Sequence, residues 1–250
     1  MLAALLELAP GGVEQVDGEG FIEYALYGAP GELPSFPPGE ASVGGVAVRV
    51  SGEPVADDWA ERWKEFHEPV LIRDRMFVRP PWASPRPGML DLVVDPGRAF
   101  GTGAHATTRL SLELLLEQAP GGSLADLGCG SGVLAIAAAR LGFTPVTAVD
   151  NELAALEATR ANAAVNGVTL ERVEPLDLRA ERPPAAQTVT ANLMRPLLLR
   201  LASLIDEHPE TLIVSGLLDE EADEVVAAFA PLTERRRLSS QGWSALLLSR

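Results

Sequence analysis

The sequence is short of cysteine, of positive charge and of long apolar runs, and each shortage excludes a class of protein. Cys129 is the one cysteine, so no intrachain disulfide can form and a reducing compartment is compatible. A membrane helix needs roughly 18 to 20 consecutive apolar residues, which no stretch provides, and the first residues lack the basic start of a signal peptide. We therefore expect a soluble cytoplasmic protein with no membrane partner.

Positive charge is outnumbered, with 20 Lys and Arg residues against 35 Asp and Glu residues and a net charge of −15. This balance argues against a chain whose main partner is a bare phosphate backbone, because such partners are usually held by basic patches. A basic partner is favoured instead. Acidic residues that merely solvate the surface would give the same balance.

What the sequence does contain is a run of alternating glycines at Gly128, Gly130 and Gly132, between the apolar residues 124–127 and an alanine-rich stretch. The pattern indicates a strand, a tight turn and a helix. Glycine permits positive φ and close approach of the backbone to a ligand, and the helix start leaves N–H groups facing the same space. The turn therefore predicts a nucleotide or nucleoside pocket, in which Cys129 serves as a small side chain rather than as a nucleophile.

From residue 124 onward apolar strands alternate with helical stretches. We expect an α/β fold: a seven-stranded, doubly wound, mostly parallel sheet with an antiparallel pair at one edge. The expected strands begin at Leu124 and then occupy residues 145–149, 170–173, 187–191, 211–215, 232–238 and 243–249.

The first third of the chain has a different character. Residues 1–55 combine a possible helix at 2–8 with two or three strands, which indicates a small α+β domain for partner contact or for stability. Trp59, Trp63 and Phe66 recur at helical spacing, so we expect a helical linker over residues 56–70. The second domain then covers residues 71–250, with short strands at 76–79 and 90–94 around a proline-rich loop.

Ligands of such sheets bind beyond the carboxyl ends of the strands, near the first one. Asp126, Asp150, Asp177 and Asn192 all fall at that edge. Asp150 ends the second strand about twenty residues past the glycines, where a carboxylate can accept both ribose hydroxyls or can cap the next helix.

Gly130-x-Gly132-x-x-Ala135 also satisfies the relaxed fingerprint of a nicotinamide dinucleotide site. Two features favour a different ligand. Asp126 is expected to direct negative charge toward the site. Gly128 adds a glycine before that fingerprint, so that a Gly-x-Gly-x-Gly pattern begins one step earlier. Both suit a ligand that carries an ammonium and a sulfonium.

The loop at residues 95–108 is rich in glycine and hydroxyl side chains and also holds Phe100 and His105. It is a candidate lid that ends at a threonine N-cap, and His105 can be either a reactive or a capping side chain.

These motifs resemble a known family. Residues 126–132 with Asp150 resemble the first motifs of the Rossmann-like class I S-adenosylmethionine-dependent methyltransferases, and residues 100–108 are similar to the signature of the bacterial ribosomal-protein L-eleven methyltransferases. The resemblance implies an N-terminal substrate-recognition domain, a helical linker and a catalytic domain. It also implies methylation of lysine side-chain and α-amino nitrogens of a basic ribosomal protein, without direct nucleic-acid contact. We expect a monomer and no metal.

The family assigns cofactor contact to the positions of Thr107, Gly128, Asp150 and Asn192. Adding the residues from the strand-end argument, the expected cofactor set also includes Asp126, Gly130, Gly132 and Asp177. Asn192 and the carbonyl of Leu193 are expected to hold the acceptor nitrogen, with Phe100 and His105 completing the catalytic set. Related enzymes have Asn-Pro-Pro-aromatic here, so the stacking aromatic must be another residue, with Phe100 and Trp243 as candidates.

Three other functions stay open. They are N-methylation of an RNA, DNA or small-molecule acceptor, a nicotinamide-dependent oxidoreductase, and a non-catalytic partner of the ribosome that senses the cofactor.

Overall fold

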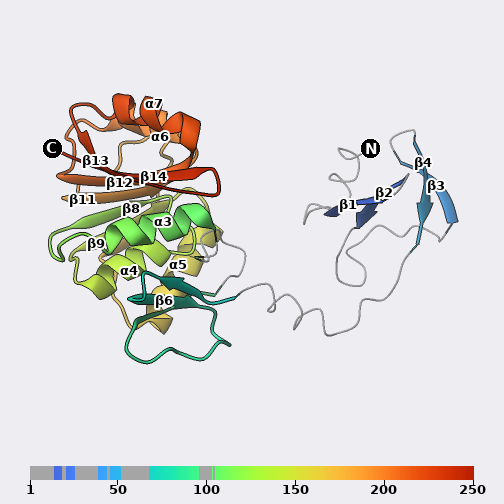
Figure 1. Cartoon of the computed structure of the whole chain (residues 1–250), viewed down its shortest axis with the longest axis horizontal. Coiled ribbons are helices and arrows are strands. Elements are labelled where there is room, and N and C mark those ends of the chain that lie inside the picture. Colours follow the sequence, from blue (N-terminus) through green and yellow to red (C-terminus); the bar gives the residue numbers. More distant parts are fainter. Residues whose placement is uncertain are drawn as a thin grey trace. The chain divides into compact units, whose positions relative to one another are not determined.

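The computed structural model describes residues 14–18, 21–25, 39–43, 46–51, 68–95, 103 and 105–250. The chain divides into two compact units, Met1–Ala60 and Glu61–Arg250 (Figure 1). The expected helix at 2–8, residues 56–67 of the expected linker and Phe100 lie outside the described residues. The last three residues of the expected linker, 68–70, are not helical, and Val70 begins a strand.

The described part of the first unit consists of two antiparallel hairpins. β1 (Glu14–Gly18) pairs with β2 (Phe21–Ala25), and β3 (Gly39–Val43) pairs with β4 (Val46–Val50). The strands expected near residues 21 and 42 are present. β1 was not expected, and its polar sequence explains why apolar alternation did not mark it.

The second unit begins with a small sheet of β5 (Val70–Ile72), β6 (Met76–Arg79) and β7 (Leu90–Val93). β5 is antiparallel to β6, and β6 is parallel to β7. β6 and β7 match the prediction, whereas β5 is only three residues long and was missed. Arg79 pairs with Asp91 at 2.8 Å across the two parallel strands.

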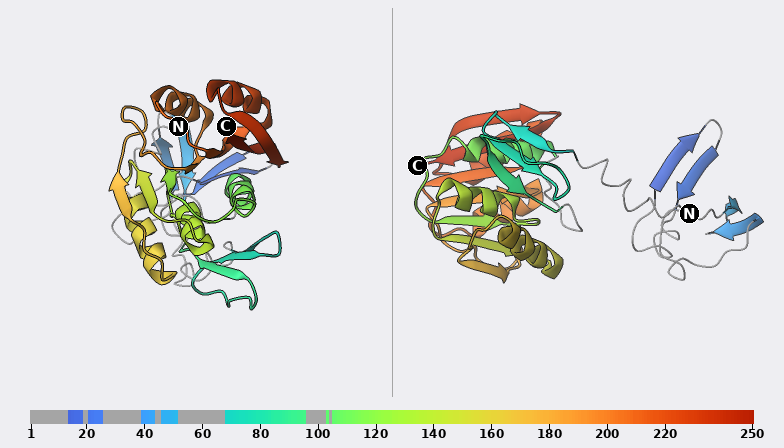
Figure 2. Two further views of the ribbon diagram at one scale, coloured as in Figure 1. Left: turned by 90° about the vertical axis from the view of Figure 1, so that its left-hand side faces the viewer. Right: turned by 90° about the horizontal axis from the view of Figure 1, so that it is seen from below.

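The main sheet has seven strands in the order β10-β9-β8-β11-β12-β14-β13 (Figure 2). Its strands are β8 (Leu124–Leu127), β9 (Val146–Asp150), β10 (Arg172–Pro175), β11 (Thr188–Asn192), β12 (Thr211–Leu218), β13 (Thr233–Ser240) and β14 (Trp243–Ser249). The five strands from β10 to β12 are parallel, and β14 is antiparallel to both β12 and β13. The expected seven-stranded, mostly parallel sheet is confirmed, with the antiparallel pair at one edge.

Helices cover both faces of this sheet, so it is doubly wound as expected (Figure 1). The helices are α3 (Ala106–Leu115), α4 (Val133–Leu141), α5 (Leu153–Val165), α6 (Arg195–Leu204), the short 3-10 helix η1 (Asp219–Glu221) and α7 (Ala222–Ala228).

Two apolar cores result. One lies under α3, α4 and α5 and includes Ile136 and Leu156, and the small sheet adds Met76 and Leu92 to it. The other lies under α6 and α7. Neighbouring residues of β8 face opposite cores, and all four are buried, which explains why this strand is an unbroken apolar run apart from Asp126.

Within the described residues, no helix is both long and apolar enough to cross a membrane. In that same part of the chain, no group of three or more His, Cys, Asp or Glu side chains is arranged to hold a metal ion.

Candidate functional site

The glycine turn between β8 and α4 has the backbone geometry that its sequence predicts. Gly128, Gly130 and Gly132 have φ of +73°, +53° and +80°. The N–H groups of Gly128 and Cys129 donate to the carbonyl of Val149 at 2.8 and 3.0 Å, which fastens the turn to the end of β9. The turn therefore sits at the carboxyl edge of two adjacent parallel strands.

Gly132 is required for packing as well as for its φ. A Cβ at this position would lie 2.8 Å from both Oγ1 and Cγ2 of Thr159 on α5. The Thr159 hydroxyl in turn donates to the Gly130 carbonyl at 3.0 Å. Gly132 thus lets Thr159 pack closely against the turn, and it does not line the cavity.

Asp150 ends β9 and uses both carboxylate oxygens to order backbone. Oδ2 accepts from the Gly130 N–H at 2.9 Å, and Oδ1 accepts from the Glu152 N–H at 3.0 Å. The N-cap of α5 is Glu152, so Asp150 is not itself the cap.

A cavity of about 510 Å³ opens beside the turn, at the carboxyl ends of β8, β9 and β11. Six of the predicted site residues line it: Gly128, Gly130, Asp150, Asp177, Asn192 and Leu193. The other described candidates, which do not line it, are His105, Thr107, Asp126, Gly132 and Trp243. Its volume falls within the range of about 300–1,000 Å³ that small-molecule sites occupy.

Asp126 departs from the expectation that it faces the ligand. Its side chain is 1% exposed and lies beneath the turn, where Thr190 Oγ1 donates to Oδ1 at 2.8 Å and the Ala135 N–H donates to Oδ2 at 3.1 Å. Burial raises the pKa of this carboxyl to about 7, against the opposing effect of those two hydrogen bonds. Because β8 is buried on both faces, alternation along the sequence did not reveal where Asp126 points. Asp126 therefore does not place a negative charge in the cavity, and it no longer argues against a dinucleotide.

Asp177 follows β10 at the rim of the cavity and is paired within its own turn. The Arg179 side chain donates from Nε to Oδ1 at 2.8 Å, and the Arg179 N–H donates to the same oxygen at 3.0 Å. These bonds lower the pKa of the Asp177 carboxyl, so it is ionised at neutral pH and its charge is paired with that of Arg179.

Asn192 ends β11, and its side chain contacts a residue of α3. Asn192 Nδ2 donates to Thr108 Oγ1 at 3.3 Å, and both residues line the cavity. Thr108 was not among the predicted residues. The hydroxyl-rich loop sequence pointed to this region but not to the threonine that faces the cavity.

The backbone on both sides of Leu193 is held by β12. The Leu193 N–H donates to the Ser215 carbonyl at 2.9 Å. Gly216, at φ +87°, packs so closely that a Cβ there would lie 2.4 Å from the Leu193 oxygen. A register shift in the β12–β14 pairing occurs at this glycine. Sequence reasoning missed Gly216, although an isolated glycine within a strand is the usual signal of such a bulge.

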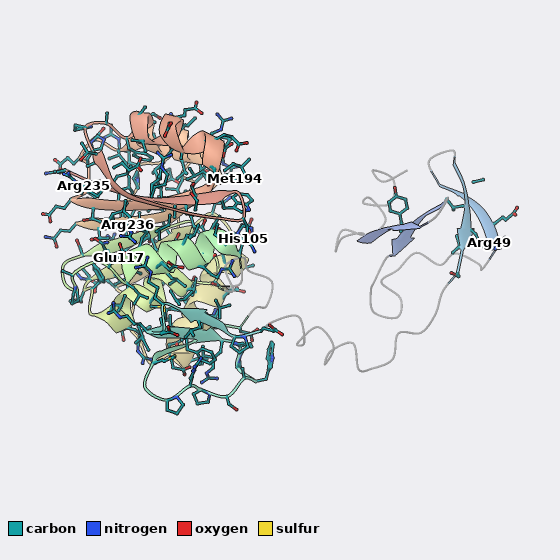
Figure 3. The ribbon with its side chains drawn as sticks, viewed as in Figure 1. Arg49, His105, Glu117, Met194, Arg235 and Arg236 are labelled. Atoms are coloured by element: carbon teal, nitrogen blue, oxygen red, sulfur yellow. The ribbon has the colours of Figure 1, made fainter. Side chains whose placement is uncertain are left out.

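His105 is the N-cap of α3 (Figure 3), so the expectation of a threonine N-cap is wrong. Its Nδ1 lies 2.8 Å from Thr107 Oγ1 and accepts from the Thr107 N–H at 3.4 Å. The ring packs edge-to-face on Trp243, with centroids 5.1 Å apart. The capping interpretation of His105 therefore describes its geometry, and Trp243 contacts this histidine while remaining outside the cavity lining.

Cys129 lines the cavity as a small, protonated side chain. Burial raises the pKa of its thiol to about 12, and Thr159 Oγ1 lies 3.3 Å from the sulfur. A thiol with that pKa is not a nucleophile at neutral pH.

Comparison with known proteins places this architecture in one family. The model of the family described as "Ribosomal protein L11 methyltransferase (PrmA)" matches residues 42–250. A ribosomal protein L11 methyltransferase of Chromobacterium violaceum is 39% identical over 197 residues, which cover 76% of this chain and 64% of that protein. The protein of the same name from Sorangium cellulosum is 36% identical over 250 residues, covering 92% of this chain and 78% of the relative.

Among solved structures, the ribosomal protein L11 methylase of Lactobacillus delbrueckii subsp. bulgaricus is similar with a TM-score of 0.67 and 27% identity. The similarity covers 74% of this chain and 99% of that one. The matched region spans less than two thirds of the length of the Chromobacterium relative. The family assignment therefore concerns the region that the two proteins share. On the family match over residues 42–250 and these relatives, the chain belongs to the ribosomal protein L11 methyltransferase (PrmA) family.

Proposed function

We propose that this chain transfers methyl groups from S-adenosylmethionine to lysine side-chain and N-terminal amino groups of ribosomal protein L11. One observation carries the proposal. The glycine turn, Asp150 and Asn192 come from three different strand ends and converge on a single cavity in a chain of this family.

The residues of the cavity fit a nucleoside cofactor with a cationic centre. The backbone of Gly128 and Gly130 gives a wall without side chains, and Asp150 lies beside it as an acceptor for ribose hydroxyls. Three carboxylates, those of Asp150, Glu152 and Asp177, line this space together with the guanidinium groups of Arg179 and Arg200. Leu176 and Leu178 add apolar surface for a base. When bound, S-adenosylmethionine supplies a methyl group on a sulfonium.

The acceptor end of the site is formed by Asn192 and Leu193. An amine is a nucleophile only when neutral, and a lysine with a pKa of about 10.4 costs roughly 4 to 5 kcal/mol to neutralise at pH 7. Removal of water and a neighbouring positive charge both lower that pKa. The Asn192 amide oxygen and the Leu193 carbonyl accept N–H bonds and orient the lone pair without adding a full negative charge. Alignment of this kind contributes on the order of 7 kcal/mol or more, so no separate general base is required.

We assign substrate recognition to residues 1–55 and catalysis to residues 71–250, with the enzyme acting as a cytoplasmic monomer. The division of the chain into Met1–Ala60 and Glu61–Arg250 supports this assignment. The net charge of −15 suits a basic protein acceptor better than a nucleic acid.

The test has two parts. Calorimetry with S-adenosylhomocysteine and with NAD distinguishes the two nucleotide classes, and the proposal requires binding of the first alone. Transfer of a labelled methyl group to purified L11, to ribosomal RNA or to neither then identifies the acceptor class. Label on RNA but not on L11 contradicts the proposal, and cofactor binding with no transfer indicates a non-catalytic partner of the ribosome.

A further inference from the structure

The side chains of Thr108 and Asn192 meet at the inner wall of the cavity, although 84 residues separate them in the sequence. Thr108 belongs to the first turn of α3 and is 1% exposed, whereas Asn192 is the last residue of β11 and is half-buried. Asn192 Nδ2 donates to Thr108 Oγ1 at 3.3 Å. The contact therefore joins a helix to the strand end that carries the acceptor-binding amide.

In this contact the Asn192 carboxamide directs its donor end to Thr108. A carboxamide has a donor end and an acceptor end, and a half-turn of the group exchanges them. An amine brings N–H groups to the site, so it pairs with the amide oxygen and not with the amide nitrogen. With Nδ2 directed to Thr108, Oδ1 is left for the incoming amine.

The second oxygen at the acceptor end needs no such help. The backbone on both sides of Leu193 is held by β12, because the Leu193 N–H donates to the Ser215 carbonyl and Gly216 packs closely against the Leu193 carbonyl. The direction of this carbonyl is set by the backbone of β12. Asn192 Oδ1, in contrast, can rotate away unless a side chain holds the other end of the amide.

We infer that Thr108 is a positioning residue for methyl transfer, which holds the Asn192 carboxamide with its oxygen toward the acceptor nitrogen. This inference rests on the proposed function. Thr108 acts through Asn192, so its loss slows transfer after the cofactor and the acceptor have bound. Its neighbour Thr107, engaged with His105, has a separate task in capping α3.

Two substitutions separate the hydroxyl from the shape of the side chain. Thr108→Val removes the hydroxyl at nearly constant volume, and Thr108→Ser retains the hydroxyl while removing the methyl group. We expect kcat of Thr108→Val to fall about tenfold, as for the loss of one neutral hydrogen bond. We expect the Kd for S-adenosylhomocysteine and the KM for L11 to change less than about threefold, and Thr108→Ser to recover most of kcat.

A double-mutant cycle tests the route through Asn192. In an Asn192→Ala background, Thr108→Val should change kcat less than about twofold, because the group that Thr108 positions is already absent. Thermal unfolding of each purified variant, read with the cofactor-binding measurement, identifies any variant that does not fold.

Three results would overturn the inference. They are an unchanged kcat for Thr108→Val, a serine variant as slow as the valine variant, or an equal fall in kcat with and without Asn192. A fall in cofactor affinity that matches the fall in kcat would assign Thr108 to the cofactor wall and would also overturn it. If Thr108→Val does not fold, Thr108→Ala takes its place in the double-mutant cycle, and Thr108→Ser remains the variant that keeps the hydroxyl. Failure of the wild-type chain to methylate L11 is a different outcome, which contradicts the proposed function instead.

Discussion

The Gly130 N–H donates to Asp150 Oδ2 at 2.9 Å, and this bond joins the turn after β8 to the end of β9. The same carboxylate accepts from the Glu152 N–H through its other oxygen. Asp150 therefore orders the wall of the cavity and presents charge to it. A residue with both tasks should affect cofactor affinity more than turnover.

Asp150→Ala should weaken binding of S-adenosylhomocysteine about 10- to 100-fold, because hydrogen bonds to charged groups contribute about 1.5 to 3 kcal/mol. Calorimetry measures the Kd directly. Glu157→Ala, on the exposed side of α5, is the control and should bind normally. Wild-type affinity in Asp150→Ala would show that the carboxylate does not contact the cofactor.

Asn192→Ala should behave in the opposite way. We expect a Kd for S-adenosylhomocysteine within about threefold of wild type and a fall in kcat of about 100-fold, because the lost oxygen acts on the acceptor and not on the cofactor. Steady-state kinetics with L11 provides the measurement. Equal losses of cofactor binding in Asn192→Ala and Asp150→Ala would contradict this division of roles.

Gly216→Ala should distort the Leu193 peptide. The added Cβ would lie 2.4 Å from the Leu193 oxygen at a residue with φ +87°, and positive φ alone costs alanine about 1 to 2 kcal/mol. We expect a larger loss of unfolding free energy than this, together with reduced kcat.

Gly242→Ala is the matched control for that substitution. Its φ is +80°, and nothing lies within 4 Å of the added Cβ. It should show the backbone cost without the loss of turnover. Equal kcat in the two variants, measured beside chemical denaturation, would mean that the Leu193 carbonyl has no part in the reaction.

The raised pKa of the buried Asp126 carboxyl predicts that the stability of the fold decreases as pH rises. The carboxyl ionises near 3.8 in an unfolded chain and at about 7 in the fold, where burial disfavours its charge. Between these values the folded state keeps a proton that the unfolded state has released. The stabilising contribution is therefore complete below about pH 4 and is lost as pH rises through about 7, at up to about 1.4 kcal/mol per pH unit.

Asp126→Asn cannot ionise and should lose that slope. Denaturation of wild type and variant at a series of pH values between about 4 and 8 provides the comparison. Parallel curves for the two proteins would show that Asp126 is not the titrating group.

Residues 1–55 should be needed for the protein substrate and not for the cofactor. A chain that lacks them should still bind S-adenosylhomocysteine, since all the described residues that line the cavity lie between Thr108 and Arg200. It should no longer methylate L11. Undiminished methylation by the shortened chain would contradict a recognition role for the first unit.

Local patterns in the sequence predicted the seven strands and the glycine turn, because apolar runs and glycine spacing act over a few residues. They also predicted Asp150 and Asn192, which stand at strand ends where the sheet itself brings them to one edge. The direction of Asp126 was wrong, because a strand buried on both faces carries no alternation to read. Thr108 and Gly216 were missed for another reason, since each acts on a residue far away in the sequence, and their roles become visible only once the sheet is assembled.

The most direct test of the account is mass spectrometry of L11 after incubation with this chain and isotopically labelled S-adenosylmethionine. The account predicts labelled methyl groups on lysine side chains and on the N-terminal amine of L11, and their loss with Asn192→Ala. An unlabelled L11, while the same preparation binds S-adenosylhomocysteine or labels another molecule, would contradict it.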